Sequence, residues 1–410
     1  MHQMKPSEFD WNQFVERYWE KETRLFDRKQ ADSLPQIDAA ELFSAVVACV
    51  GDYRRGGQQK VRVYVDNSEV DVLGGNHQFL LPDQSDRSFD GYNDRLVTGE
   101  GLQDYALIIA DWHQFDRILW ERILTAVNSL SGIVGISNSR MDTQVFVGTY
   151  KTTPFGVHSD PTSGFHFPVV GSKKMRFWPE KFAAVTPDLN GALNYERFKS
   201  KSTVATAQMG EALYWPSTEW HVAESDGKFS VTWGFGYWLG DGIKTLALHV
   251  LAGLLATSPS TREPLSSRNI EGPAWSRAPL QTLITELGTV VNDSRFMCAL
   301  TQGWLKQFSA SGYLRVPAMC AGLGRYDGTV ELKPAYTILV APYEIGSVLV
   351  AAGGYSEVFE DDDELRRTIT ELNSKRSARL TSPNGNGEGR QSSWRLLDFC
   401  YRSGTLTVTG

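Results

Sequence analysis

The chain reads Thr153-Pro-Phe-Gly-Val-His-Ser-Asp160 and, later, Gly210-Glu-Ala-Leu-Tyr-Trp-Pro-Ser-Thr-Glu-Trp-His221, and these two stretches decide its fold. His158 and Asp160 lie on the same side of an extended segment, because strand side chains alternate with a period of two. His221 follows Asp160 by 61 residues, so a ligand from this position must come from another strand. Two imidazoles and one carboxylate form the facial triad that holds non-haem Fe(II) and leaves the opposite face open. The three residues therefore predict a metal site at the mouth of a small β-barrel.

The segments on either side of these candidate ligands have the pattern of strands. Residues Thr143–Tyr150 read as a strand that leads into the first ligand segment. Residues Phe165–Trp178 read as two strands separated by a turn at Gly171, and Phe229–Trp238 reads as a further strand after His221. A strand, a short turn and a strand around each ligand segment are what a site at the mouth of a barrel requires.

This pattern resembles the JmjC-type (cupin) 2-oxoglutarate-dependent oxygenases. Lys173 lies fifteen residues after His158, where the resemblance implies the Lys or Arg that pairs with the distal carboxylate of 2-oxoglutarate. A cation two residues beyond a turn can reach into a barrel and bind an anion in a dry pocket. Lys174 and Arg176 are the competing candidates, and alternation puts them on the face opposite Lys173. The remaining alternative is that all three cations lie on a solvated strand.

Four hydroxyl side chains are candidates for further contacts with bound 2-oxoglutarate. Related enzymes often have a hydroxyl close to Thr149, and alternation allows only one of Thr149 and Tyr150 to face inward. Ser230 and Thr232 share one face of the last strand. Simple packing within the strands is the alternative for each of the four residues.

The beginning of the chain carries a second resemblance. Residues Phe9–Phe26 resemble the opening of the ribosomal oxygenase branch of this family, in which a helix ending in a Tyr-Trp pair leads into the first strand. The chain departs from that branch at Glu22-Thr23, where a Pro-Leu pair is usual. A second helix is expected near Asp38–Val50 and a strand at Val61–Val65. The polar stretch Pro82–Asp94 reads as a long surface loop, with a lid over the site as the alternative.

The region after the barrel has the pattern of a helical segment. After a linker at Thr257–Ser267, Leu280–Val291 and Phe296–Phe308 read as helices. In ribosomal oxygenases a helical segment at this place makes a dimer, so the resemblance implies a homodimer.

The C-terminal end reads as a helix, a loop, a second helix and a strand. Residues Glu357–Leu372 read as an acid-capped helix, and the Gly- and Asn-rich loop Ser382–Gly389 follows it. Residues Trp394–Tyr401 and the strand Thr405–Val408 complete the order. This order resembles the winged-helix module that ends the same oxygenases. The acidic helix argues against nucleic-acid binding and for a role in docking a partner.

Composition excludes several classes of protein. At 410 residues the chain is long enough for two or three domains, and 41% apolar and 22% charged residues are ordinary for a globular protein. The net charge of −7 and the pI of about 5.6 argue against general nucleic-acid binding, which needs a basic face. No apolar run approaches the length of a membrane span, and the N-terminus lacks the apolar core of a signal peptide. Four scattered cysteines indicate free thiols in a reducing cytoplasm, where we expect the protein to work.

The predicted fold class is α+β, with a double-stranded β-helix (cupin or JmjC jelly-roll) core. The expected domains, in chain order, are N-terminal helices and strands that flank the barrel, a catalytic barrel, a helical linker and dimerisation region, and a winged-helix-like domain. Their expected bounds are residues 1–105, 106–245, 246–330 and 331–410.

The resemblance implies an Fe(II)- and 2-oxoglutarate-dependent dioxygenase that uses O2 and releases succinate and CO2. His158, Asp160 and His221 would hold the metal, and Lys173 would hold the cosubstrate. The expected substrate is an amino-acid side chain in a protein or peptide, because both ends of the chain also resemble ribosomal oxygenases. One alternative is a small-molecule hydroxylase of secondary metabolism, acting on an amino acid or a natural-product intermediate. The other is a non-enzymatic, metal-binding cupin.

Overall fold

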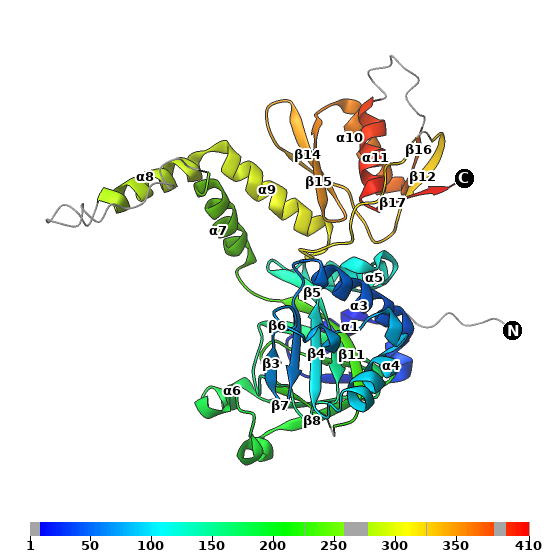
Figure 1. The fold of residues 1–410 in the computed structure, drawn as a ribbon. Helices are drawn as coiled ribbons and strands as arrows, with labels where there is room; N and C mark the ends of the chain where they lie inside the picture. Colours follow the sequence, from blue (N-terminus) through cyan, green and yellow to red (C-terminus); the bar gives the residue numbers. More distant parts are fainter. Residues whose placement is uncertain (1–8, 226, 258–277, 325, 381–390, 410) are drawn as a thin grey trace. The chain divides into compact units, whose positions relative to one another are not determined.

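The computed structural model describes residues 9–225, 227–257, 278–324, 326–380 and 391–409. It divides into two compact units (Figure 1). Unit 1 comprises Met1–Gly240 and Tyr313–Ala318, and unit 2 comprises Asp241–Gly312 and Met319–Gly410. Both units combine helices with antiparallel sheets, so the predicted α+β class is confirmed.

Unit 1 is built around two antiparallel sheets. The larger sheet has the strand order β1-β9-β6-β11-β5-β4-β2-β3, and the smaller sheet has the order β10-β7-β8. The larger sheet therefore joins strands from the first hundred residues to strands that flank the candidate ligands. Its strands are β1 (Arg24–Phe26), β2 (Val61–Val65), β3 (Ser68–Val70), β4 (Tyr105–Ala110), β5 (Arg140–Gly148), β6 (Thr162–Val170), β9 (Ala212–Trp215) and β11 (Ser230–Trp238). The strands of the smaller sheet are β7 (Ser172–Trp178), β8 (Thr203–Gln208) and β10 (Trp220–Glu224).

Strand β11 shows how the sequence separates the packed face of the larger sheet from its inner face. Trp233, Phe235 and Tyr237 are almost fully buried and belong to the hydrophobic core. Gly234 and Gly236 alternate with them and therefore point to the other face. Glycine at both positions leaves this inner face open, since no side chain fills it.

The turn at Gly171 joins β6 to β7, as predicted. Its φ of +67° is in the left-handed region, and a Cβ there would lie 2.7 Å from the carbonyl oxygen of Phe229, so the position requires glycine. Along β7, Lys173 is buried whereas Lys174 and Arg176 are partly exposed. The predicted alternation of the three cations between two faces is therefore confirmed.

Unit 1 also contains three longer helices. Helix α1 (Trp11–Arg17) and helix α3 (Ala39–Arg54) lie where the sequence predicts them. Asp38 caps α3 and forms a capping box with Glu41, which explains why the helix begins there. Helix α5 (Arg117–Val134) is an amphipathic helix that the prediction lacks. The shorter helices are α2 (Arg28–Ala31), α4 (Phe89–Asp94) and α6 (Glu180–Ala183).

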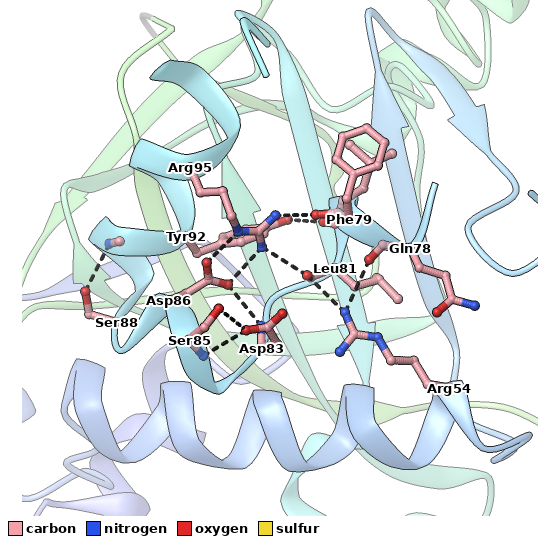
Figure 2. Close-up of polar contacts among 12 residues, drawn as sticks. Arg54, Gln78, Phe79, Leu81, Asp83, Ser85, Asp86, Ser88, Tyr92 and Arg95 are labelled. Atoms are coloured by element: carbon pink, nitrogen blue, oxygen red, sulfur yellow. Dashed lines mark hydrogen bonds and ion pairs between the residues drawn. The ribbon is translucent and has the colours of Figure 1, made fainter. Parts of the chain in front are cut away.

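The stretch Pro82–Asp94 is not the long loop that its composition predicts. Gln84–Asp86 forms a 3-10 turn, and α4 follows two residues later. Figure 2 shows Arg95 pairing with both carboxylate oxygens of Asp86, at 2.6 and 2.9 Å, while Arg54 from α3 donates to two backbone carbonyls. The Asp86 side chain is only 2% exposed. These hydrogen bonds hold the segment against the rest of unit 1, whereas a lid needs a segment that can move.

Unit 2 begins with three helices, α7 (Gly242–Leu255), α8 (Ala278–Asn292) and α9 (Ser294–Ser309), and the last two match the predicted helices. Helix α7 contacts α9 closely, since a Cβ on Gly303 would lie 2.7 Å from a methyl group of Leu246. Within the described residues, no helix has both the length and the apolar content that crossing a bilayer requires. All but the first residue of the expected linker 257–267, and the whole expected loop 382–389, lie outside the described residues.

The rest of unit 2 contains two three-stranded sheets with the orders β16-β12-β17 and β13-β14-β15. The predicted helix Glu357–Leu372 is partly wrong, because its first residues belong to β15, which pairs with β14. Helix α10 begins only after Asp362, whose carboxylate accepts the backbone N–H of Leu365 at 2.7 Å. The acidic run therefore marks the helix start and not its interior. The remaining elements are β12 (Gly328–Leu332), β13 (Leu339–Pro342), β14 (Ser347–Ala352), β15 (Tyr355–Glu360), α10 (Asp363–Lys375), β16 (Ser377–Leu380), α11 (Gln391–Arg402) and β17 (Leu406–Thr409), the last helix and strand as predicted.

Candidate metal centre

The structure brings His158, Asp160 and His221 together, as their spacing predicts. His158 and His221 form an antiparallel bridge in which each backbone N–H donates to the carbonyl oxygen of the other, at 3.0 and 2.7 Å. Nε2 of His158 lies 3.7 Å from Oδ2 of Asp160. Each of the three residues offers one ligand atom, and these atoms lie within 4.8 Å of one another, which suits a single ion.

Hydrogen bonds determine which nitrogen of each ring is free. Nδ1 of His158 lies 3.0 Å from the carbonyl oxygen of Gly156, and Nδ1 of His221 lies 3.0 Å from that of Glu219. A carbonyl oxygen can only accept, so each Nδ1 carries a proton, and in the neutral ring the free lone pair is then on Nε2. Burial, together with the neighbouring His158, lowers the pKa of His221 to about 3, so this ring is neutral at pH 7. The rings thus have the tautomer that binds a metal through Nε2.

The donor set fits a divalent first-row transition metal. Two neutral imidazoles and one carboxylate match the ligand preferences of iron, and three protein ligands leave coordination positions for other molecules. Within the described part of the chain, these three side chains are the cluster that could hold a metal ion, and no fourth candidate ligand joins them.

A cavity of about 480 Å³ lies between the inner faces of the two sheets and includes the three candidate ligands in its wall. Its volume lies within the roughly 300–1,000 Å³ that small-molecule sites usually occupy. Even-numbered residues of β5, β6 and β11 form most of one wall, as the period of two predicts, and Met141 and Phe235 also reach it. The even-numbered residues are Asp142, Gln144 and Phe146 from β5, Thr162, Gly164 and His166 from β6, and Gly234, Gly236 and Trp238 from β11.

Lys173 lines the same cavity from β7, and it is only 3% exposed. Its Nζ lies 3.5 Å from the hydroxyl oxygen of Tyr150 and 4.3 Å from the ring centre of Phe146. Among the residues that the structure describes, no carboxylate forms an ion pair with this amine. Burial lowers the pKa of Lys173 to about 7. A buried amine without a carboxylate partner is a natural binding group for an anion that enters the cavity.

The two competing cations on β7 have a different role. Lys174 and Arg176 both pair with Glu224, at 3.0 and 2.7 Å, on the face away from the cavity. Burial alone would raise the pKa of Glu224, but hydrogen bonds from Arg176, Lys174 and Tyr195 outweigh it and bring the pKa to about 2. This network ties β7 to β10, the strand that carries His221.

The four predicted hydroxyl contacts divide between two environments. The hydroxyl of Thr149 donates to the carbonyl oxygen of Gln103 at 3.1 Å, so it is already satisfied there. The hydroxyl of Tyr150 faces Lys173, and Ser230 lies within hydrogen-bonding reach of Tyr150. The Oγ1 atom of Thr232 is buried and has no hydrogen bond within the described residues. Tyr150 is thus the hydroxyl that lies beside Lys173, Ser230 lies beside Tyr150, and Thr232 shares its face of β11 with Ser230.

Part of the cavity wall comes from a segment that sequence reasoning missed. Leu314 and Arg315 line the cavity, although they follow helix α9 in the chain. His113 holds this segment, because its Nε2 lies 2.9 Å from the carbonyl oxygen of Arg315. The Arg315 side chain pairs with Asp111 at 3.4 Å. No local pattern could signal these contacts, since the partners are about two hundred residues apart.

No protein-family model matches the sequence, and no curated protein matches it. Solved structures do match its fold. The X-ray structure of YcfD from E. coli aligns with a TM-score of 0.51 at 14% sequence identity, covering 98% of this chain and 98% of that one. Another structure of YcfD, a ribosomal oxygenase from Escherichia coli, aligns with a TM-score of 0.50 at 13% identity and the same 98% coverage of both chains. The predicted resemblance is therefore confirmed for the fold: over nearly its whole length, this chain is similar in structure to a ribosomal oxygenase.

Proposed function

We propose that this protein is an Fe(II)- and 2-oxoglutarate-dependent dioxygenase that hydroxylates an amino-acid side chain in a protein or peptide. The observation that carries the proposal is the presence, in one cavity, of the His158, Asp160 and His221 cluster and the buried amine of Lys173. The similarity in fold to a ribosomal oxygenase supports the proposal. The proposal includes the finer architecture, in which the two sheets of unit 1 are the halves of a double-stranded β-helix.

His158, Asp160 and His221 would hold Fe(II) through two Nε2 atoms and one carboxylate oxygen. When bound, iron with 2-oxoglutarate and O2 supplies the oxidative chemistry, in which 2-oxoglutarate becomes succinate and CO2 and a C–H bond of the substrate becomes C–OH. One oxygen atom of O2 enters succinate and the other enters the substrate, so the atoms balance. The chain contributes placement: the backbone bridge between the histidines sets the spacing of their rings.

Lys173 would pair with the distal carboxylate of 2-oxoglutarate. An ion pair inside this buried site is strong, because little water competes for either charge. The incoming carboxylate would also restore the charged form of the amine, since an opposite charge raises the pKa of a lysine. The hydroxyl of Tyr150 lies 3.5 Å from the amine nitrogen, and Ser230 lies within hydrogen-bonding reach of Tyr150. Thr232 would offer a further hydroxyl from the same face of β11 as Ser230. Phe146 covers the amine from the side and keeps water away.

One observation favours a second candidate, a hydroxylase of a free amino acid or another small molecule. The cavity of about 480 Å³ has the size of a small-molecule site, and it is large enough for a cosubstrate and one side chain. The two candidates differ in what stimulates the consumption of 2-oxoglutarate, a peptide or a free small molecule.

We further propose that the protein forms a homodimer through helices α7, α8 and α9. Large apolar side chains on these helices are exposed although they are unfavourable in water, and none of the α7 residues is buried. Sedimentation of the wild-type chain should show a dimer, and Leu248→Asp on α7 should shift it to monomer. The exposed apolar residues of the three helices are Ile243, Leu248, Leu283, Ile284, Val291 and Met297.

The experiment that tests the function is succinate formation from 2-oxoglutarate by the purified protein with Fe(II) and ascorbate, with and without a peptide pool. We expect slow turnover that one peptide fraction accelerates and that His158→Ala abolishes. His77→Ala is the matched control, because His77 is exposed in unit 1 and does not line the cavity. No turnover, together with no 2-oxoglutarate binding to the anaerobic Fe(II) protein, would contradict the proposal and favour a non-enzymatic cupin.

A further inference from the structure

Three polar side chains meet at the inner face of the larger sheet. They come from neighbouring strands, Asp142 from β5, Thr162 from β6 and Trp238 from β11. Gly236 lies directly opposite Asp142 in the register of β11 and β5. A Cβ on Gly236 would lie 2.8 Å from Oδ1 of Asp142, 3.0 Å from Oγ1 of Thr162 and 3.4 Å from Nε1 of Trp238. The three atoms therefore converge, and we name this group around Gly236 the Gly236 subsite.

The converging atoms are only weakly partnered. Oγ1 of Thr162 is buried without a hydrogen bond within the described residues. Oδ1 of Asp142 and Nε1 of Trp238 are buried and make no hydrogen bond of good geometry there, although the side chains of Trp238 and Gln144 lie close enough to Asp142 to lower its pKa. Asp142 is only 4% exposed, and its ion pair with Arg140 is long, at 3.8 Å. Burial and the charge of Asp111 raise the pKa of Asp142 to about 6. Native proteins rarely leave several buried polar atoms unpaired at one place, so the arrangement points to a ligand.

The subsite lies next to the candidate metal ligands. Thr162 follows Asp160 by two residues, and both line the cavity. Two residues of extended chain span about 7 Å, so the subsite lies roughly one side-chain length from the carboxylate ligand. A substrate group held by the subsite would thus leave a carbon of the same side chain within reach of the metal.

We propose that the Gly236 subsite recognises an uncharged amide of the substrate, namely the side-chain carboxamide of an asparagine or glutamine residue. The proposal rests on the proposed function, and it names the class of side chain that the oxygenase would take.

The distribution of donors and acceptors favours an amide over a cation. Asp142 accepts hydrogen bonds, whereas the indole N–H of Trp238 can only donate. An amide satisfies both, because its NH2 group donates to the carboxylate and its carbonyl oxygen accepts from the indole. The guanidinium of Arg140 lies over the Trp238 ring at 4.0 Å, and its Nε is also unpaired. A cationic substrate would offer these two donors no acceptor, would compete with them for Asp142, and would place a second positive charge beside Arg140.

The test is the binding of defined probes to the Zn(II)-loaded protein with 2-oxoglutarate present, measured by saturation-transfer NMR and titration. Zinc keeps the complex from turning over, because it has no redox chemistry. The probes are the N-acetyl, N-methylamide derivatives of glutamine, asparagine and arginine, which imitate residues in a peptide, and free L-glutamine, which represents the small-molecule source. We expect a carboxamide probe to bind more tightly than the arginine probe.

Asp142→Asn should lower the affinity for the carboxamide probe about ten- to hundredfold, the usual effect of losing a hydrogen bond to a charged group. Thr162→Val should weaken it about two- to tenfold and provides the test if the first variant fails to fold. Asp104→Asn is the matched control, since Asp104 is also partly buried in unit 1 but does not line the cavity.

Tighter binding of the arginine probe, or unchanged affinity in both subsite variants, would overturn the inference. Binding of free L-glutamine alone would keep the amide chemistry and assign it to a small molecule. Binding of 2-oxoglutarate, followed in the same samples, separates the two proposals. Its absence counts against the oxygenase itself, whereas cosubstrate binding without any carboxamide binding counts against the subsite alone.

Discussion

Replacing Lys173 by methionine should make the protein more stable while removing its cosubstrate. The amine is 3% exposed and has no carboxylate partner within the described residues, so the folded state must accommodate a charge without compensation or give up the proton. Methionine has a side chain of similar length and no charge. The substitution therefore removes the penalty of burial but also removes the group that would bind the distal carboxylate.

The size of the effect follows from the pKa. Burial lowers the pKa of Lys173 from an ordinary 10.5 to about 7. Each pKa unit corresponds to about 1.4 kcal/mol, so keeping this amine in the folded state lowers the free energy of unfolding by about 5 kcal/mol at pH values below 7. A volume-conserving substitution in a core costs up to about 1.5 kcal/mol through imperfect packing. We expect a net gain of about 3 kcal/mol for Lys173→Met at pH 7.

The pH dependence provides a second check. Because the folded pKa lies below the unfolded one, the folded protein binds fewer protons between pH 7 and 10.5, and wild-type stability rises with pH in this window. The penalty of burial is complete below pH 7 and shrinks to about 2 kcal/mol at pH 9. The advantage of the variant should therefore narrow as the pH rises. Thermal and urea unfolding of both proteins without 2-oxoglutarate at pH 7 and pH 9 would measure it.

Lys174→Met is the matched control on the opposite face of β7. Lys174 pairs with Glu224 at 3.0 Å, so its loss should lower stability slightly and leave 2-oxoglutarate binding intact. Lys173→Met should weaken the binding of 2-oxoglutarate at least about tenfold, as expected for the loss of a charge-assisted hydrogen bond. If Lys173→Met unfolds at the same temperature as the wild type or lower at pH 7, the reasoning about an uncompensated buried amine is refuted.

Three further predictions concern other parts of unit 1. Asp160→Ala should abolish Fe(II)-dependent 2-oxoglutarate binding, measured anaerobically, and retained binding would remove this carboxylate from the ligand set. Glu224→Gln should lower the free energy of unfolding by about 3 kcal/mol at neutral pH. The pKa of Glu224 is about 2 in the folded protein and 4.5 ordinarily, so the stabilising contribution of its charge is complete above pH 4.5 and disappears as the pH falls toward 2. Urea unfolding near pH 2 should therefore give the same free energy of unfolding for the wild type and Glu224→Gln. Asp86→Ala should cost about 1–3 kcal/mol, because Arg95 loses its carboxylate partner but keeps its hydrogen bonds to two backbone carbonyls. Unchanged thermal unfolding would contradict the network of Figure 2.

The sequence predicts the centre of the site well because the prediction depends on the period of two in strands. His158 and Asp160 share a face for that reason, and Lys173 is separated from Lys174 by the same rule. The turn at Gly171 is equally local, since a positive φ and a close backbone neighbour both require glycine there. Each of these signals is contained within a few residues.

Signals that depend on distant partners could not be predicted in this way. The polar residues around Asp86 look like a solvated loop until Arg95 and the α3 residue Arg54 are placed beside them. Arg315 reaches the cavity wall only because His113 holds its backbone. The helix predicted from Glu357 begins later, because residues 357–360 belong to β15 and pair with β14. Over four residues, the pattern of a half-buried strand cannot be distinguished from that of an amphipathic helix.

The paired backbone hydrogen bonds between His158 and His221 have a consequence for which metal the protein carries. The main chain sets the same separation of these two ligands for every divalent first-row ion, so it gives the site no preference for iron. Nickel and zinc bind such nitrogen and oxygen donors more tightly than iron does. Occupancy in a cell would then follow metal supply, and a protein purified by nickel affinity would leave the column misloaded. Chelation followed by the addition of Fe(II) under anaerobic conditions should restore the iron-loaded protein.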